Sequence, residues 1–269
     1  MSVSLFAGVD LPAPELVAVD GGQACVFTER RPGRTTDNED AAVVIPGAGG
    51  CCVLAVADGL GGLPAGDAAA RMALQQLADH TAGQAGEQQR ESVLSGLELA
   101  NQAIMAKGQG AGTTVAVAAI DGHTVRTSIV GDSMIVVCGQ RGRLKYRSVA
   151  HSPVGYAEAT GMLDEDDAMF HAERHLVSNI VGTAGMHVEV GPVVKLALRD
   201  TLVLGSDGLF DNLYVGEVVE LVRVGALETA AGRLLAACRQ RMRESGGDAP
   251  HKPDDLTFIL YRRNPESGS

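Results

Sequence analysis

The chain has 269 residues and a formal net charge of −11, and 45% of its residues are hydrophobic although only 3% are aromatic. This composition supplies a sizeable core of Val, Leu, Ile and Ala, which predicts a mixture of strands and helices. The acidic balance, without a basic stripe, argues against a nucleic-acid-binding protein.

The first half of the chain predicts strands followed by a helix pair. Alternating or continuous apolar runs indicate strands, whereas apolar residues three and four positions apart indicate helices. Gly-rich stretches mark the turns between these elements. In chain order we expect a loose or edge segment at 1–15, a strand or hairpin at 17–29, a loop at 30–37, strands at 41–45 and 51–57, and helices at 67–80 and 87–107.

The second half predicts further strands, a polar excursion and a second helix pair. The order of strand groups and helix pairs indicates a layered α+β fold rather than βαβ repeats. We expect consecutive antiparallel strands at 113–120, 124–130, 134–138 and 144–148, an excursion at 151–185, strands at 188–198 and 201–206 around a turn, helices at 215–224 and 226–245, a last strand at 256–262 and a frayed tail at 263–269.

Cysteine usage and the N-terminal segment indicate the compartment. The five Cys show no C-x-x-C spacing, which is typical of proteins in a reducing environment. The N-terminus lacks the basic and long apolar segments of a signal peptide, and no apolar run approaches membrane-spanning length. We therefore expect a cytoplasmic protein that acts as a monomer without a membrane partner.

Acidic clusters stand at the ends of the predicted strands. Carboxylates at strand ends can converge at one edge of a sheet, where they repel one another unless cations lie between them. A single Asp-Gly is usually only a turn, but the joint pattern points to a pair of divalent cations. Oxygen ligands suit Mg²⁺ or Mn²⁺ rather than Zn²⁺. The clusters are Asn38-Glu39-Asp40, Asp58-Gly59, Gly131-Asp132-Ser133, Ser206-Asp207-Gly208 and Asp254-Asp255.

Six motifs, in order along the chain, resemble those of the metal-dependent Ser/Thr protein phosphatases, the PPM or type 2C family, in its bacterial form. The resemblance implies a four-layer α-β-β-α sandwich, in which helix pairs flank two central antiparallel β-sheets. It also implies a single phosphatase domain over 1–269, with a flap-like subregion at about 152–185. The motifs are Asn38-Glu39-Asp40-Ala41, Ala57-Asp58-Gly59-Leu60-Gly61-Gly62, Gly112-Thr113-Thr114, Gly131-Asp132-Ser133, Ser206-Asp207-Gly208-Leu209-Phe210-Asp211 and Asp254-Asp255-Leu256-Thr257.

The resemblance implies a role for each residue of a two-metal centre. Asp58 is expected to bridge both ions, which would be Mn²⁺ or Mg²⁺. Asp207 and Asp254 would hold the first ion, and Glu39 with the backbone carbonyl of Gly59 would hold the second. Gly59 suits that role because a residue without a side chain lets its carbonyl approach a cation.

Three further residues are expected beside the two-metal centre. Asp132, together with Asp207, would form the weaker third metal site of bacterial family members. Asp40 is expected to orient water rather than to touch a metal. Arg34 is expected to bind the phosphate, because its fork matches phosphate oxygens.

The implied reaction is the hydrolysis of phosphoSer and phosphoThr by direct attack of a metal-bridging hydroxide, without a covalent phosphoenzyme. Two cations can stabilise the attacking and leaving oxygens and lower the pKa of a bridging water. Phosphorylated proteins are the expected substrates, and a cognate Ser/Thr kinase is the expected partner. Two alternatives stay open: a regulatory pseudophosphatase that binds phosphoproteins, and a purely structural metal protein.

The chain departs from the family pattern at two positions near the expected site. The phosphate-binding Arg of the family stands four residues before the Glu, where this chain has Thr35, and Arg34 stands one residue earlier. Arg30, Arg31 or Arg34 could therefore bind phosphate, or Arg34 could be a solvated loop charge. Leu60 replaces a His that some members carry as a proposed general acid, and it cannot donate a proton.

Overall fold

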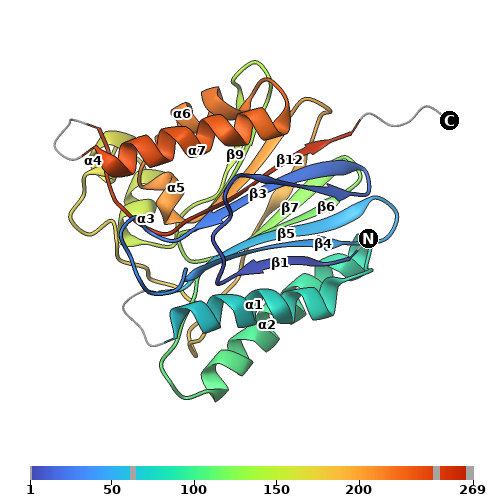
Figure 1. The fold of residues 1–269 in the computed structure, drawn as a ribbon. Helices are drawn as coiled ribbons and strands as arrows, with labels where there is room; N and C mark the ends of the chain where they lie inside the picture. The colour runs from blue at the N-terminus through green and yellow to red at the C-terminus, as the bar shows by residue number, and fades with distance from the viewer. Residues whose placement is uncertain (1, 61–64, 245–248, 265–269) are drawn as a thin grey trace.

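Two six-stranded sheets stack face to face, and a pair of helices covers the outer side of each sheet (Figure 1). The structure is a computed structural model that describes residues 2–60, 65–244 and 249–264. The first sheet has the strand order β1-β4-β5-β6-β7-β10, and the second has β2-β3-β12-β11-β8-β9, with antiparallel pairing throughout. The predicted four-layer α+β sandwich is confirmed.

The middle strands of the first sheet are buried on both faces, whereas its edge strands are half-buried (β1) or largely exposed (β10). In β4, Ala41, Val43 and Ile45 pack against the helices, whereas Ala42 and Val44 pack between the two sheets. Because successive side chains of a strand point to opposite faces, a strand covered on both sides is apolar throughout. The strands are β1 Ser4–Ala7, β4 Asp40–Pro46, β5 Cys51–Asp58, β6 Val115–Asp121, β7 Thr124–Val130 and β10 Glu189–Lys195.

The middle strands of the second sheet follow the same rule, whereas its edge strands β2 and β9 are partly exposed. Phe27 and Phe258 lie on neighbouring strands with ring centroids 5.6 Å apart and face the outer helices. Val26 and Ile259, one position along, face the first sheet instead. The strands are β2 Glu15–Val19, β3 Gly22–Glu29, β12 Leu256–Arg263, β11 Thr201–Gly205, β8 Met134–Cys138 and β9 Leu144–Arg147.

Each helix pair buries the apolar stripe that its sequence predicts. On the first sheet, α1 (Gly66–Thr81) and α2 (Gly86–Ala106) approach closely at Gly96, where a side chain would crowd the backbone of Leu77. Buried Val and Leu residues at helical spacing cover the second sheet. That pair is α6 (Val215–Val222) and α7 (Leu227–Arg243), and the short helices are α3 (Pro153–Ala159), α4 (Glu165–Met169) and α5 (Asp207–Phe210).

The predicted run of consecutive antiparallel strands between residues 113 and 148 is wrong in one respect. β6 pairs with β7 and β8 with β9, but β7 and β8 belong to different sheets. The chain crosses between the sheets at Gly131, whose φ of 102° suits glycine. Apolar patterning marks buried strands but does not name their partners, and β10 and β11 likewise lie in different sheets.

Most other predicted elements match the structure. The segment at 17–29 forms the hairpin β2–β3, and the loose or edge segment at 1–15 contains the edge strand β1. The tail was predicted from residue 263, but Arg263 still belongs to β12, and 265–269 lie outside the described residues.

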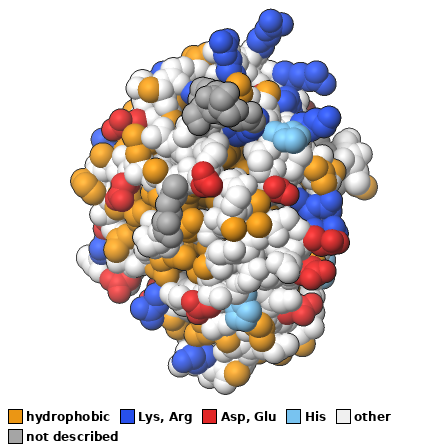
Figure 2. Space-filling model, turned by 90° about the vertical axis from the view of Figure 1, so that its right-hand side faces the viewer, with side chains coloured by type: hydrophobic (Ala, Val, Ile, Leu, Met, Phe, Trp, Pro, Cys, Tyr) orange, Lys and Arg blue, Asp and Glu red, His pale blue; other side chains and the backbone are white. Residues whose placement is uncertain are grey.

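Figure 2 shows the end of the sandwich that lies on the right of Figure 1, where Lys and Arg side chains gather near the upper margin among scattered acidic and hydrophobic ones. Charge on this face is mixed, so the face does not indicate whether a binding partner would be acidic or basic.

All five cysteines are free and buried. Among the described residues, no helix is both long and apolar enough to cross a membrane.

Gly208 allows α5 to pack against the chain that enters β12. A Cβ at this position would overlap the backbone carbonyl of Asp255, so we expect Gly208→Ala to lower the free energy of unfolding by about 1–3 kcal/mol. Gly232, inside α7, has open space around the same atom, and Gly232→Ala should raise that free energy by about 0.5–1 kcal/mol. Urea denaturation measures both, and equal stability of the two variants would contradict the tight α5–β12 contact.

Candidate metal centre

Acidic residues from both sheets meet at one end of the sandwich. Asp40 begins β4 and Asp58 ends β5, and the two are register partners. Asp207 stands two residues after the end of β11, at the start of α5, and Asp254 stands two residues before β12. Asp132 lies in the crossing between β7 and β8. The strand order of the two sheets therefore places carboxylates that are far apart in the sequence at the same end of the sandwich.

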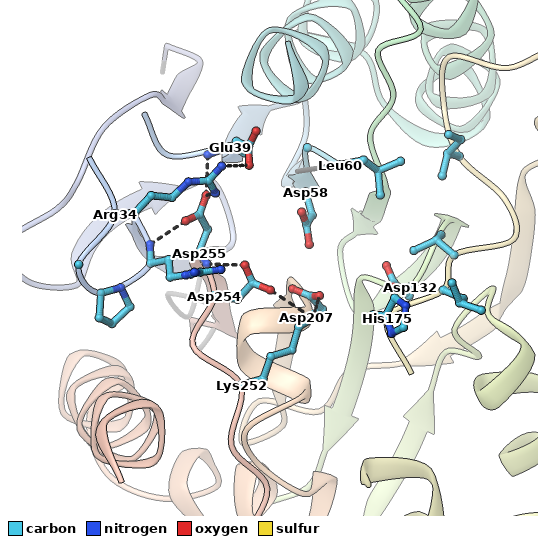
Figure 3. Close-up of a pocket in the computed structure, with 17 residues that line it drawn as sticks. Arg34, Glu39, Asp58, Leu60, Asp132, His175, Asp207, Lys252, Asp254 and Asp255 are labelled. Carbon is cyan, nitrogen blue, oxygen red and sulfur yellow. Dashed lines mark hydrogen bonds and ion pairs between the residues drawn. The ribbon is translucent and has the colours of Figure 1, made fainter. Parts of the chain in front are cut away.

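All of these side chains except that of Asp40 line a pocket with a volume of about 830 Å³ (Figure 3). The structure brings together there every residue predicted to hold metal, and Arg34 lines the same pocket. Asp40 does not line it, but lies buried behind it and accepts a hydrogen bond from Ser206 Oγ at 2.7 Å. His175 reaches the pocket from the flap-like segment. The predicted metal residues in the lining are Glu39, Asp58, Gly59, Asp132, Asp207 and Asp254.

Burial and mutual repulsion raise the pKa values of the clustered carboxyl groups. Burial, followed by the charges of Asp207 and Asp40, raises the pKa of Asp58 well above its usual value. Burial and Asp207 raise the pKa of Asp132 to about 8 and that of Asp254 to about 6. Holding all these groups charged at neutral pH therefore costs free energy unless cations compensate them.

The chemistry of the donor set fits hard divalent cations. All the candidate ligands are carboxylate or carbonyl oxygens, which Mg²⁺ and Mn²⁺ prefer. Asp40 Oδ1 is buried and has no hydrogen-bond partner among the described residues, as expected for an atom that faces water or an ion. Among the described residues, no group of three or more His, Cys, Asp or Glu side chains is already arranged so that it could hold a metal ion. Lys252 and Arg34 pair with these carboxylates instead.

Asp255 holds the loop that carries Arg31 and Arg34 beside the carboxylate pocket. Its carboxylate accepts hydrogen bonds from the backbone N–H groups of Arg31 and Glu39, each at 2.7 Å. Arg34 forms an ion pair with Glu39 at 2.6 Å and lies 3.6 Å from Asp255. Asp255 is only 4% exposed, so these contacts fix the position of the loop. The motifs assign no role to Asp255, because motif spacing does not show which backbone groups a carboxylate will reach.

The three candidate phosphate-binding arginines differ in their surroundings. Arg30 forms an ion pair with Asp10 at 2.6 Å and donates to the carbonyl of Thr36, and it does not line the pocket. Arg31 and Arg34 both line the pocket beside the carboxylates. The structure therefore leaves two of the three predicted candidates in position to meet a phosphate.

His151 ties the flap-like segment to the crossing that carries Asp132. Its Nδ1 lies 3.2 Å from the backbone N–H of Gly131 and 2.8 Å from the side-chain amide of Asn179. Both groups donate, so Nδ1 accepts and Nε2 carries the hydrogen, which points to Glu189 at 3.1 Å. The neutral imidazole therefore links the two segments.

We expect this link to weaken in acid. Burial lowers the pKa of His151, although Glu189 raises it, and His187 stacks on the ring and lowers it. The unfolded chain therefore takes up a proton first, so stability is full above about pH 6.5 and falls as the pH drops below that value. Thermal melts and hydrogen exchange of the flap amides between pH 8 and pH 5 would measure this loss. The variant His151→Asn should have a shallower pH dependence, and equal slopes would contradict the assignment.

The chain is similar to known protein phosphatases. A family model described as Protein phosphatase 2C matches residues 32–240. Serine/threonine phosphatase stp of Listeria welshimeri is 30% identical over 239 residues, which cover 84% of this chain and 90% of that protein. Stp1 from Staphylococcus aureus, a serine/threonine phosphatase, has a TM-score of 0.78 at 25% identity over 90% of this chain and 95% of its own. The catalytic domain of PstP, solved with two manganese ions, shares the fold with a TM-score of 0.68 at 22% identity, over 89% and 96% of the two chains.

Proposed function

This chain belongs to the protein phosphatase 2C family and is a metal-dependent serine/threonine phosphatase, and we propose that the pocket at the strand ends is its active site. One observation carries the assignment of the site: the strand-end carboxylates of both sheets converge in one pocket together with Arg34. The family relationship does not favour a pseudophosphatase, and the carboxylates that a metal-dependent hydrolase needs are all present.

The carboxylates divide into two groups around Asp58. Asp58 stands between the others in Figure 3 and would hold both cations. Asp207 and Asp254 would hold the first, and Glu39 with the carbonyl of Gly59 would hold the second. Two bound cations would supply a water of lowered pKa and would neutralise charge on the phosphoryl oxygens. Mn²⁺ or Mg²⁺ suits this oxygen-only site, and a fold neighbour was solved with two manganese ions.

The lining of the pocket supports direct hydrolysis. The described residues that line it include no Ser, Thr, Cys or Tyr, so no hydroxyl or thiol stands ready to form a covalent phosphoenzyme, and the carboxylates that could act as nucleophiles would be engaged by the cations. Asp40, held by Ser206, would orient water, and Arg34 would bind the phosphoryl oxygens through its fork. Leu60 also lines the pocket and donates no proton, so the leaving oxygen must take its proton from water or from another group.

The substrates that fit this site are phosphorylated proteins. The pocket opens beside Leu176, Val177 and Ile180 of the flap-like segment, which would contact residues next to the phosphorylated side chain. We propose that the chain acts as one phosphatase domain over 1–269, as a cytoplasmic monomer that counters a cognate Ser/Thr kinase.

Hydrolysis of phosphoSer and phosphoThr peptides, followed as release of inorganic phosphate, tests the proposed function. We expect turnover with Mn²⁺ or Mg²⁺, loss of turnover after chelation, and recovery when the metal is restored. Calorimetry that detects tight phosphopeptide binding without phosphate release in the presence of either metal would favour the pseudophosphatase instead. Metal-dependent melting without either binding or turnover would indicate a purely structural metal protein.

A further inference from the structure

We propose that Lys252 is a built-in cation of the metal centre, and that it takes the place of a third divalent ion so that the centre binds two. This inference rests on the proposed function of the pocket. It concerns the number of ions that the acidic cluster accepts, and it opposes the expectation that Asp132 and Asp207 hold a third ion.

Lys252 contacts three carboxylates at once. Its Nζ pairs with Asp207 Oδ2, lies 2.8 Å from Asp211 Oδ2 and lies 3.2 Å from Asp254 Oδ2. An ammonium group has three N–H donors, so each can be matched to one carboxylate. Figure 3 shows the side chain rising from below toward Asp207 and Asp254. The ammonium group therefore occupies a position between carboxylates that a metal ion would otherwise have to neutralise.

The backbone of Lys252 is held in place by a buried side chain. Asn212, which is 0% exposed, donates from its amide to the carbonyl of Lys252 at 2.8 Å. Its amide oxygen accepts from the backbone N–H of Lys252 at 2.9 Å, and its amide also reaches the carbonyl of Gly208 at 2.9 Å. The Asn212 side chain thus bonds both the N–H and the carbonyl of Lys252 and is itself bonded to α5, the helix that starts with Asp207. These hydrogen bonds fix the backbone position of Lys252.

The charge of Lys252 reaches the residues of the expected third site. Asp207, which Lys252 contacts, is one of the two carboxylates expected to hold the third ion, and Asp132, the other one, lines the same pocket. The positive charge of Lys252 compensates Asp207 directly and would repel a divalent ion placed between Asp132 and Asp207. Asp207 and Asp254, which Lys252 contacts, would also help to hold the first ion. Asp58, Glu39 and the Gly59 carbonyl make no described ion pair or hydrogen bond with Lys252, so two ions bound beside Asp58 would keep ligands that it does not touch.

The number of bound ions tests the proposal. The full chain is stripped of metal by chelation and titrated with Mn²⁺ by calorimetry, and the protein-bound metal is counted after gel filtration. We expect two ions for the wild type and for Lys252→Arg, and three for Lys252→Met, the third being the weakest. Lys107→Met is the matched control, since it removes the same charge from an exposed position and should leave the number at two.

Stability gives a second readout. Without metal, Lys252→Met should melt at a lower temperature than the wild type, because the three carboxylates lose their cation. Added Mn²⁺ should then raise its melting temperature by more than it raises that of the wild type, since the variant binds one more ion. If Lys252→Met does not fold, Lys252→Gln keeps a polar side chain at the same position and repeats both measurements.

Three ions bound to the wild type, or two bound to the folded Met or Gln variant, would overturn this proposal and leave the proposed function intact. A wild-type chain that binds no Mn²⁺ would instead refute the metal-dependent site as a whole.

Discussion

Replacing Asp58 by Asn is expected to reduce kcat/KM for a phosphopeptide by about a thousandfold, which corresponds to about 4 kcal/mol of transition-state stabilisation. In the proposed centre Asp58 would hold both cations, so its loss would weaken the binding of each. Asn has the same shape but carries no charge, and its amide would turn a donor toward a cation. Initial rates at saturating Mn²⁺, together with calorimetric titration of Mn²⁺, measure the loss of activity and of metal binding.

The same substitution should stabilise the chain when metal is removed. Burial and the charges of Asp207 and Asp40 raise the pKa of Asp58, so its ionised form destabilises the native state at neutral pH. Asn relieves that repulsion, and the melting temperature after chelation should rise while the further rise on adding Mn²⁺ shrinks. A residue with a purely structural role would show the opposite change.

Asp79→Asn is the matched control, because Asp79 is exposed on α1 and its carboxylate accepts a hydrogen bond from Gln75. It removes the same charge far from the site and should leave activity and metal binding unchanged. Full activity of Asp58→Asn at saturating Mn²⁺ would show that the cations, if they bind, do so elsewhere.

The carboxylate end of the sandwich could be predicted from the sequence because two independent signals coincide there. Runs such as 51–57 are apolar throughout, which indicates strands covered on both faces. The acidic residues Asp58 and Asp207 stand where such runs end, and a sheet brings strand ends to a common edge. The sequence thus contained both the layered fold and the residues of the site, although not the pairing of the strands.

Lys252 and Asp255 could not be assigned in this way. Each acts through the direction of a side chain in a loop, and that direction depends on partners far away in the sequence. Asn212 holds the backbone of Lys252 across 40 residues, and Asp255 accepts from Glu39 across 216. The crossing at Asp132 was missed for a related reason: a period-two pattern states which side chains are buried but not which sheet a strand joins.

The identity of the phosphate-binding residue can be decided by comparing three conservative changes. Arg34→Lys is expected to raise KM for a phosphopeptide, and the inhibition constant of inorganic phosphate, by about 10- to 100-fold, with a smaller effect on kcat. Lysine keeps the charge but loses the planar fork, and hydrogen bonds to a charged group are worth about 1.5–3 kcal/mol. Arg30→Lys should leave both constants unchanged, because Arg30 pairs with Asp10 outside the pocket.

Arg31→Lys completes the comparison, since Arg31 lines the pocket too. If this variant rather than Arg34→Lys weakens phosphate inhibition, the assignment passes to Arg31. Arg34 also pairs with Glu39, so it could act by positioning a metal ligand. Calorimetry with Mn²⁺ separates the two roles. If Arg34 binds phosphate, the metal affinity of Arg34→Lys should be unchanged. If Arg34 positions Glu39, this variant should bind metal more weakly and show no specific loss of phosphate inhibition. The 2.6 Å ion pair makes the second readout necessary, because a rise in KM alone would fit either role.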